Sequence, residues 1–160
     1  MARMVEPVRP GATIQHAAPA DLPRLLEIRY AAFSAQAPLA YSAQEVENLL
    51  GDVDEDELRE MIRNRQVFIV RTGGRVVGLA GWKGPYLRHV YVDPGHTRRG
   101  IGTMLLSRVE ADFRDRTGAG EIRAGVGLQA EPFYLANGYE LVERARAWDD
   151  SEFLWMAKQL

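Results

Sequence analysis

The chain has 160 residues, a length typical of one domain and large enough to bury a core without disulfide bonds or a structural metal. It contains no cysteine, which excludes a disulfide framework, a thiolate nucleophile and cysteine-based zinc sites. Twenty basic and 22 acidic side chains give a net charge of −2, which argues against nonspecific binding to nucleic acid or to an anionic membrane.

The first eleven residues contain two prolines and lack the apolar core of a signal peptide. We therefore expect 1–11 to be a flexible N-terminal tail and 12–160 to be a single domain. The apolar runs that follow are far too short to span a bilayer. The short apolar runs and the lack of cysteine favour a cytoplasmic protein without a membrane partner. The net charge favours one without a nucleic-acid partner.

Strand and helix patterns alternate along the chain without repeats, which is typical of an α/β or α+β fold. Strand patterns are expected at 13–16, 66–71, 76–82, 86–92, 121–127, 139–147 and 152–158. Helical patterns are expected at 18–29, from about 42, within 52–65, at 101–114 and at 132–137. The uncharged stretch 30–44 contains Pro38, which should break the first helix, and Asp54 with Glu57 has the spacing of a capping box.

The segment 90–103, VYVDPGHTRRGIGT, predicts a strand that breaks into a turn and restarts as a helix. Gly100 and Gly102 lack a Cβ, so the backbone can bend sharply there and present N–H groups to an anion. Arg98 and Arg99 and the helix N-terminus add positive charge. The segment therefore indicates a site for a phosphate or pyrophosphate group. It is neither a Walker loop, because the chain has no Gly-Lys pair, nor a dinucleotide fingerprint, because Leu105 stands at the third glycine position.

This segment resembles the Arg/Gln-x-x-Gly-x-Gly acyl-CoA loop of the GNAT superfamily of N-acetyltransferases, with Val-x-Val upstream. A second segment, AEPFYLANGY at 130–139, resembles the family's Phe-Tyr-x-x-x-Gly-Phe motif. The likeness extends over nearly the whole chain from about residue 12. It implies an α+β GNAT fold: a mixed, mostly antiparallel sheet of about seven strands, flanked by helices and splayed between the fourth and fifth strands at 86–92 and 121–127.

The resemblance implies transfer of an acetyl group from acetyl-CoA, the co-substrate, to a primary amine by direct attack and without a metal. The acceptor is an unidentified small molecule or peptide amine, and a homodimer is an assembly that many relatives form. The implied cofactor-binding residues are Val90, Tyr91, Val92, Thr97, Arg98, Arg99, Gly100, Ile101, Gly102, Thr103 and Phe133. Thr97 departs from the Arg or Gln of the family loop, which should matter little because backbone N–H groups do most of the binding.

Tyr134 matches the family position whose hydroxyl faces the departing sulfur, so the resemblance makes it the proton donor to the CoA thiolate. Full proton transfer from a phenol to a thiolate is uphill by roughly 2 kcal/mol from reference pKa values, which favours hydrogen bonding or a relayed proton. A base is harder to assign, because Tyr86 stands where some relatives carry a glutamate. His89 on the same strand is a candidate, and a water chain to backbone carbonyls is the alternative.

The sequence gives the least information about the residues that bind the acceptor amine. Tyr30, Phe33 and Tyr41 from the uncharged stretch and Trp82 from the third strand are candidates for the acceptor wall, although such aromatic residues are more often core residues. The eight acids between Glu45 and Glu60 either steer a cationic amine or form a solvated helical face. The competing hypothesis for the whole chain is a non-catalytic acyl-CoA-binding sensor or interaction module.

Overall fold

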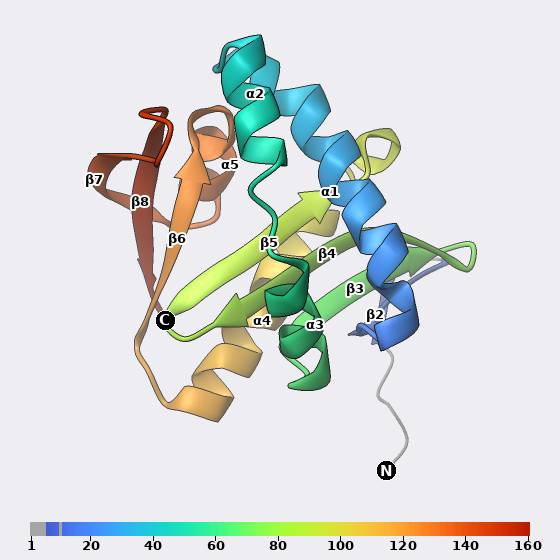
Figure 1. The fold of residues 1–160 in the computed structure, drawn as a ribbon. Coiled ribbons are helices and arrows are strands. Elements are labelled where there is room, and N and C mark those ends of the chain that lie inside the picture. Colours follow the sequence, from blue (N-terminus) through green and yellow to red (C-terminus); the bar gives the residue numbers. More distant parts are fainter. Residues whose placement is uncertain (1–5, 10) are drawn as a thin grey trace.

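The computed structural model describes residues 6–9 and 11–160. Within them, eight strands form one sheet, and five α-helices surround it (Figure 1). The strands are β1 (Glu6–Arg9), β2 (Ala12–His16), β3 (Val67–Thr72), β4 (Arg75–Lys83), β5 (Tyr86–Val92), β6 (Glu121–Gly127), β7 (Glu140–Arg146) and β8 (Glu152–Gln159). The helices are α1 (Leu22–Gln36), α2 (Ala43–Leu50), α3 (Glu55–Arg63), α4 (Ile101–Thr117) and α5 (Glu131–Ala136).

The strands lie in the order β1-β2-β3-β4-β5-β6-β8-β7. Each neighbouring pair is antiparallel except β5 and β6, which are parallel. The connection from β5 to β6 runs through α4, as a parallel pair requires a crossover. The expected mixed, mostly antiparallel α+β fold is therefore confirmed, with eight strands instead of about seven.

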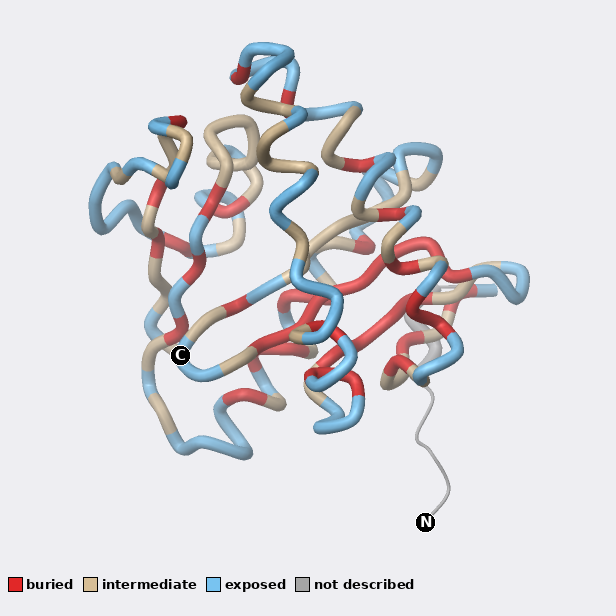
Figure 2. The backbone as a smooth tube through the Cα atoms, viewed as in Figure 1, coloured by how far each residue is buried: buried red, intermediate tan, exposed pale blue. Residues whose placement is uncertain are grey.

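The sheet is covered on both faces, which gives the fold two hydrophobic clusters. Helix α4 packs on one face against β3, β4 and β5, and α1 and α3 pack on the other. Strand β4 lies between the two layers and is buried along almost its whole length, which explains its continuous apolar run (Figure 2). Leu105, Val109 and Phe113 of α4 enter one cluster, whereas Leu25 of α1 and Met61 of α3 enter the other.

The expected flexible tail over 1–11 is wrong where the structure describes it. Residues 6–9 form strand β1, which pairs antiparallel with β2. Gly11 in the connection has φ of 82°, a left-handed conformation that glycine adopts without strain. Residues 1–5 and 10 lie outside the described residues.

The predicted helix break near Pro38 is confirmed, whereas the capping box predicted for Asp54 and Glu57 is only half formed. Helix α1 ends at Gln36, a short 3-10 turn at Ala37–Leu39 follows, and α2 begins after Ser42. At α3, the Asp54 carboxylate accepts the backbone N–H of Glu57 at 3.0 Å, but the Glu57 side chain points elsewhere and does not complete the capping box. No helix among the described residues is long and apolar enough to cross a membrane.

Candidate active site

The parallel strands β5 and β6 part soon after they meet. They are paired in register only at Tyr86 with Arg123 and at Leu87 with Ala124. Beyond these positions each strand keeps its other neighbour, since β5 pairs with β4 and β6 pairs with β8 along its whole length. The expected splay between 86–92 and 121–127 is therefore present, and it leaves a wedge-shaped opening with strand edges on both sides.

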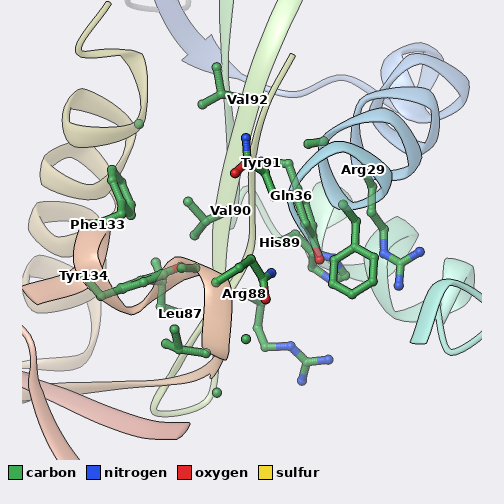
Figure 3. A pocket seen from close by; sticks show the side chains of 18 of the residues that line it. Arg29, Gln36, Leu87, Arg88, His89, Val90, Tyr91, Val92, Phe133 and Tyr134 are labelled. Atoms are coloured by element: carbon green, nitrogen blue, oxygen red, sulfur yellow. The ribbon is translucent and has the colours of Figure 1, made fainter. Parts of the chain in front are cut away.

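A cavity of about 980 Å³ occupies this opening. Its walls come from β5, the loop after it and the start of α4, from the segment after β6 that carries Phe133 and Tyr134, and from α1. Figure 3 shows Phe133 and Tyr134 on one side of β5, with Arg29 and Gln36 of α1 on the other. The volume is in the range of pockets that bind a small molecule or cofactor.

Strand β5 bulges in the middle of the cavity wall. Tyr91 pairs with Leu79 and Arg88 with Gly81, so three steps along β5 oppose two along β4. His89 within the bulge has φ of 58°, a left-handed conformation that histidine tolerates better than most side chains. The bulge turns the residues after it and aims their backbone groups differently from those of a regular strand.

His89 lines the cavity, and its ring also reaches Glu57 on α3. Its Nε2 atom is buried, lies 3.5 Å from Glu57 Oε1 and makes no hydrogen bond within the described part of the chain. Arg88 Nη2 binds the same carboxylate oxygen at 2.8 Å. Burial, reinforced by the Arg88 cation, lowers the pKa of His89 to about 4, although Glu57 acts in the opposite direction. The ring is therefore neutral at pH 7.

The loop after β5 is tied to α1 through Asp93. Its carboxylate accepts the backbone N–H of Gly95 at 2.9 Å and binds Arg24 Nη2 at 2.7 Å. Burial alone would raise the pKa of Asp93, but the Gly95 N–H and Arg24 hold it below its ordinary value. Arg24 also donates from Nε to the Val76 carbonyl at 3.0 Å. The carboxylate therefore stays charged and fixes where the loop leaves the strand.

Gly100 ends this loop with φ of 77°, and Arg98 in the same turn has φ of 62°. Helix α4 begins directly after Gly100, and the first helical bond there runs from the Met104 N–H to the Gly100 carbonyl. The N–H groups of residues 101–103 consequently have no acceptor within the helix. They lie at the cavity wall beside Arg98, where an anion can accept from them.

Gly102 also lets α4 approach α5. A Cβ at this position would lie 2.9 Å from the Phe133 Cζ atom and 3.0 Å from Cε1, too close for an undisturbed contact. Gly102 of the sequence motif therefore has a packing role. It brings the anion loop and the Phe-Tyr segment against each other.

Tyr134 is almost fully buried at the side of the cavity, with 8% of its surface exposed. Its ring meets those of Phe133 and Tyr139 edge to face, each at 5.3 Å between centroids. Within the described residues the hydroxyl has no hydrogen-bond partner, whereas the Tyr139 hydroxyl donates to Glu110 Oε2 at 2.8 Å. Burial raises the pKa of Tyr134, so its proton stays on the oxygen at physiological pH.

The structure brings most of the expected site residues together. Those that line the cavity are Tyr134, His89, Val90, Tyr91, Val92, Thr97, Arg98, Gly100, Ile101, Gly102, Thr103, Phe133 and Phe33. Three expected residues do not line it: Arg99, Tyr30 and Trp82. Arg99 and Tyr30 are exposed, and Tyr30 is 63% accessible on the outer side of α1.

Trp82 is a core residue, and its assignment to substrate binding is wrong. It is buried under α4, where its indole N–H donates to Asp112 at 2.8 Å and its ring packs against Phe113. Because β4 is covered on both faces, an aromatic residue on this strand points into a helix layer whichever way it alternates.

Sequence reasoning missed two residues with defined positions near the cavity. Arg29 lines it, and Glu57 contacts His89 from α3. Tyr41, a candidate from the uncharged stretch, also lines the cavity. The Tyr41 hydroxyl donates to the Glu152 carbonyl and accepts the Leu128 N–H, which ties the segment after α1 to the strands beyond the opening. Periodicity carried no signal for Arg29, since an arginine on a helix is ordinarily solvated.

Comparison with known proteins agrees with this geometry. A family model described as an acetyltransferase (GNAT) domain matches residues 38–160, which is most of the chain. The chain belongs to the GNAT acetyltransferase family. The resemblance of the two sequence motifs to that superfamily is thereby confirmed.

The relatives of this GNAT protein cover most of its length. An uncharacterized N-acetyltransferase, YafP, from Escherichia coli (strain K12) is 26% identical over 133 residues, covering 83% of this chain and 84% of its own. A Rhodopseudomonas palustris protein described as a GCN5-related N-acetyltransferase and class-II aminotransferase has a TM-score of 0.84 at 23% identity, covering 97% and 99% of the two chains. The PaiA N-acetyltransferase of Thermoplasma acidophilum, solved in complex with coenzyme A, has a TM-score of 0.73 at 19% identity, covering 93% and 99%.

The cavity of this GNAT domain fits coenzyme A by its own chemistry. An anion loop with free N–H groups lies at one end, and unpaired strand edges that can accept an amide-containing chain lie beside it. In the described residues, no three His, Cys, Asp or Glu side chains come together in a way that would hold a metal ion.

Proposed function

We propose that this protein transfers the acetyl group of acetyl-CoA to a primary amine by direct attack, with Tyr134 as the proton donor to the departing thiolate. The observation that carries the proposal is that the anion loop, the parted edge of β5 and Tyr134 line one cavity. Family membership supports acetyl transfer as the reaction class.

The loop at 97–103 would bind the pyrophosphate of the co-substrate. The N–H groups of residues 101–103 and the positive end of α4 point to one anion, and Arg98 adds a full charge. The pantetheine arm carries two amides, which can pair with the free edge of β5 in the manner of an added strand.

The thioester carbonyl would lie against β5 near Val90, within the bulge, and Val92, just after it. Backbone N–H groups aimed at this oxygen stabilise the negative charge that develops when nitrogen attacks the carbonyl carbon. The C–N bond forms, the C–S bond breaks, and the electron pair of that bond leaves on sulfur. The proton lost by nitrogen and the proton gained by sulfur balance the reaction.

Tyr134 is suited to donate the proton that sulfur gains. Its hydroxyl has no protein partner among the described residues and keeps its proton, because burial raises its pKa. It can donate a hydrogen bond to the thiolate as charge develops, and a proton relayed from the new ammonium group completes the exchange.

His89 has the position of a base but not the strength to deprotonate a free ammonium ion. With a pKa of about 4, it would have to take a proton from a group with a pKa near 10.4, which is uphill by about 9 kcal/mol. We therefore assign the first deprotonation to water and backbone carbonyls. His89 would accept a proton only after attack, when the nitrogen is more acidic, and through Nδ1, because Nε2 faces Glu57.

The proposal is tested by screening a panel of amines for thiol release from acetyl-CoA, with calorimetry of acetyl-CoA binding in parallel. Thiol release that depends on one class of amine is the expected result. Binding of acetyl-CoA with no release for any amine would instead favour the non-catalytic sensor.

A loop variant separates the co-substrate site from the chemistry. Arg98→Glu combined with Gly100→Asp should weaken acetyl-CoA binding by several kcal/mol, because two negative charges replace the anion's partners. Arg99→Glu is the matched control, since Arg99 is on the same loop but does not line the cavity. Equal affinity of the double variant and the wild type would show that the pyrophosphate binds elsewhere.

A further inference from the structure

Arg29 on α1 places a positive charge on the cavity wall without a carboxylate to balance it. Its Nη1 and Nη2 atoms donate to the carbonyls of Leu50 and Leu49, each at 3.0 Å. It forms no ion pair with any group of the described residues. The neighbouring cation on the wall, Arg88, differs in this respect because Glu57 binds it at 2.8 Å.

The two carbonyl bonds fix the guanidinium but leave much of its binding capacity free. Arginine carries five N–H donors in a planar fork, and the bonds to the end of α2 use two of them. Carbonyl dipoles at a helix C-terminus offset only a part of the positive charge. A half-buried guanidinium in this state is complementary to a planar anion that can accept two parallel hydrogen bonds.

The acidic residues around the cavity favour a ligand whose anionic group carries a single negative charge. Asp52 and Asp54 line its rim and are exposed, and Glu152 is bound by Arg144 at 2.7 Å. Their field is screened by solvent but still disfavours a dianion near Arg29 more than a monoanion. A carboxylate therefore fits this wall better than a phosphate.

We propose that the acceptor amine carries a carboxylate, which binds the free edge of the Arg29 guanidinium while the amine reaches the thioester at β5. Figure 3 shows the arrangement on which this rests: Arg29 reaches from α1 on the side of β5 opposite Tyr134. The inference depends on the proposed acetyl transfer for its role, but the carboxylate site can be measured without turnover.

The experiment compares amines that differ only in the charged group. The α-, β- and γ-amino acids of three to five carbons are assayed beside their carboxamides, their decarboxylated amines and the corresponding aminophosphonates. We expect the carboxylates to have a kcat/KM at least about tenfold above their uncharged counterparts. Binding of the same compounds to the CoA-loaded protein, followed by calorimetry, should give the same order.

Three variants separate recognition from stability. Arg29→Gln should abolish the preference for carboxylates, and Arg29→Lys should keep part of it because the charge remains. Arg116→Gln is the control: Arg116 also donates to the carbonyls of Asn64 and Arg65, each at 2.9 Å, but it is paired with Asp112 at 3.3 Å and does not line the cavity. It should lower stability while leaving the preference unchanged.

Each outcome decides one of the two proposals. Uncharged amines acetylated as well as the amino acids, or a preference that survives in Arg29→Gln, would overturn the carboxylate site while acetyl transfer stands. Tighter binding of the phosphonates would also overturn it. If no amine is acetylated, the proposed function fails, and the binding series alone decides whether Arg29 holds a carboxylate.

Discussion

Two neighbouring buried tyrosines offer a sharp test of the mechanism. Tyr134 and Tyr139 pack edge to face at 5.3 Å, and burial raises the pKa of both. They differ in their hydroxyl groups: within residues 6–9 and 11–160, that of Tyr139 donates to Glu110, whereas that of Tyr134 has no hydrogen-bond partner. Removing one oxygen at either position therefore makes chemically identical changes with different expected consequences.

Tyr134→Phe should lower kcat by a factor of about 100 or more, which is the usual contribution of a positioned acid. Its free energy of unfolding should change by no more than about 0.5 kcal/mol, since no protein hydrogen bond is lost. Acetyl-CoA affinity should be nearly unchanged, because the hydroxyl acts on the leaving group. Steady-state thiol release and urea unfolding measure the two quantities.

Tyr139→Phe should show the reverse pattern. It leaves a buried carboxylate oxygen of Glu110 without its donor, at a cost of about 1–3 kcal/mol, while Lys158 still binds the other oxygen at 3.0 Å. Turnover should stay within about tenfold of the wild type. Unchanged turnover in Tyr134→Phe would remove its hydroxyl from the mechanism, and a large loss of stability in that variant would show that the oxygen has a structural partner.

Three further substitutions test the site and the core. As pH falls from 6.5 to about 4, the wild type should lose up to about 3 kcal/mol of unfolding free energy, because the histidine is protonated first in the unfolded chain. His89→Asn should not show this loss. Equal acid sensitivity of the two proteins in urea titrations would refute the prediction. Gly81→Ala should cost about 1–3 kcal/mol in thermal unfolding, since its Cβ would lie 2.8 Å from a backbone oxygen, whereas Gly120→Ala meets no atom within 4 Å and should not. Gly102→Ala should displace the Phe133 ring and so weaken acetyl-CoA binding, measured by calorimetry, by about 1 kcal/mol. An unchanged affinity would show that the ring can move without disturbing the site.

The elements that form the site could be predicted from local sequence. Strands β5 and β6 begin and end where the pattern indicated, and Gly100 has the positive φ that the turn required. These features depend on neighbouring residues alone, because alternation defines the strand and a missing Cβ permits the turn.

The features that depend on pairing between distant segments could not be predicted. The bulge that turns His89 toward Glu57 arises from a mismatch with β4, which the sequence of β5 does not contain. The burial of Trp82 depends on α4 covering its strand. The position of the Arg29 guanidinium depends on the end of α2, whose carbonyls accept its hydrogen bonds. Each of these outcomes is set by tertiary contacts over which local propensity has no control.

The parallel direction of β5 and β6 explains why the two motifs meet. Parallel strands end at the same edge of a sheet, so the anion loop that follows β5 and the Phe-Tyr segment that follows β6 leave from one side. Pairing of β5 with β4 and of β6 with β8 holds the opening apart, and Gly102 and Phe133 bring the two segments close to each other. The distance between the proposed phosphate site and the Tyr134 hydroxyl is thus fixed by the sheet itself. A substitution that closed the opening by extending the pairing past Leu87 would therefore remove binding and chemistry together.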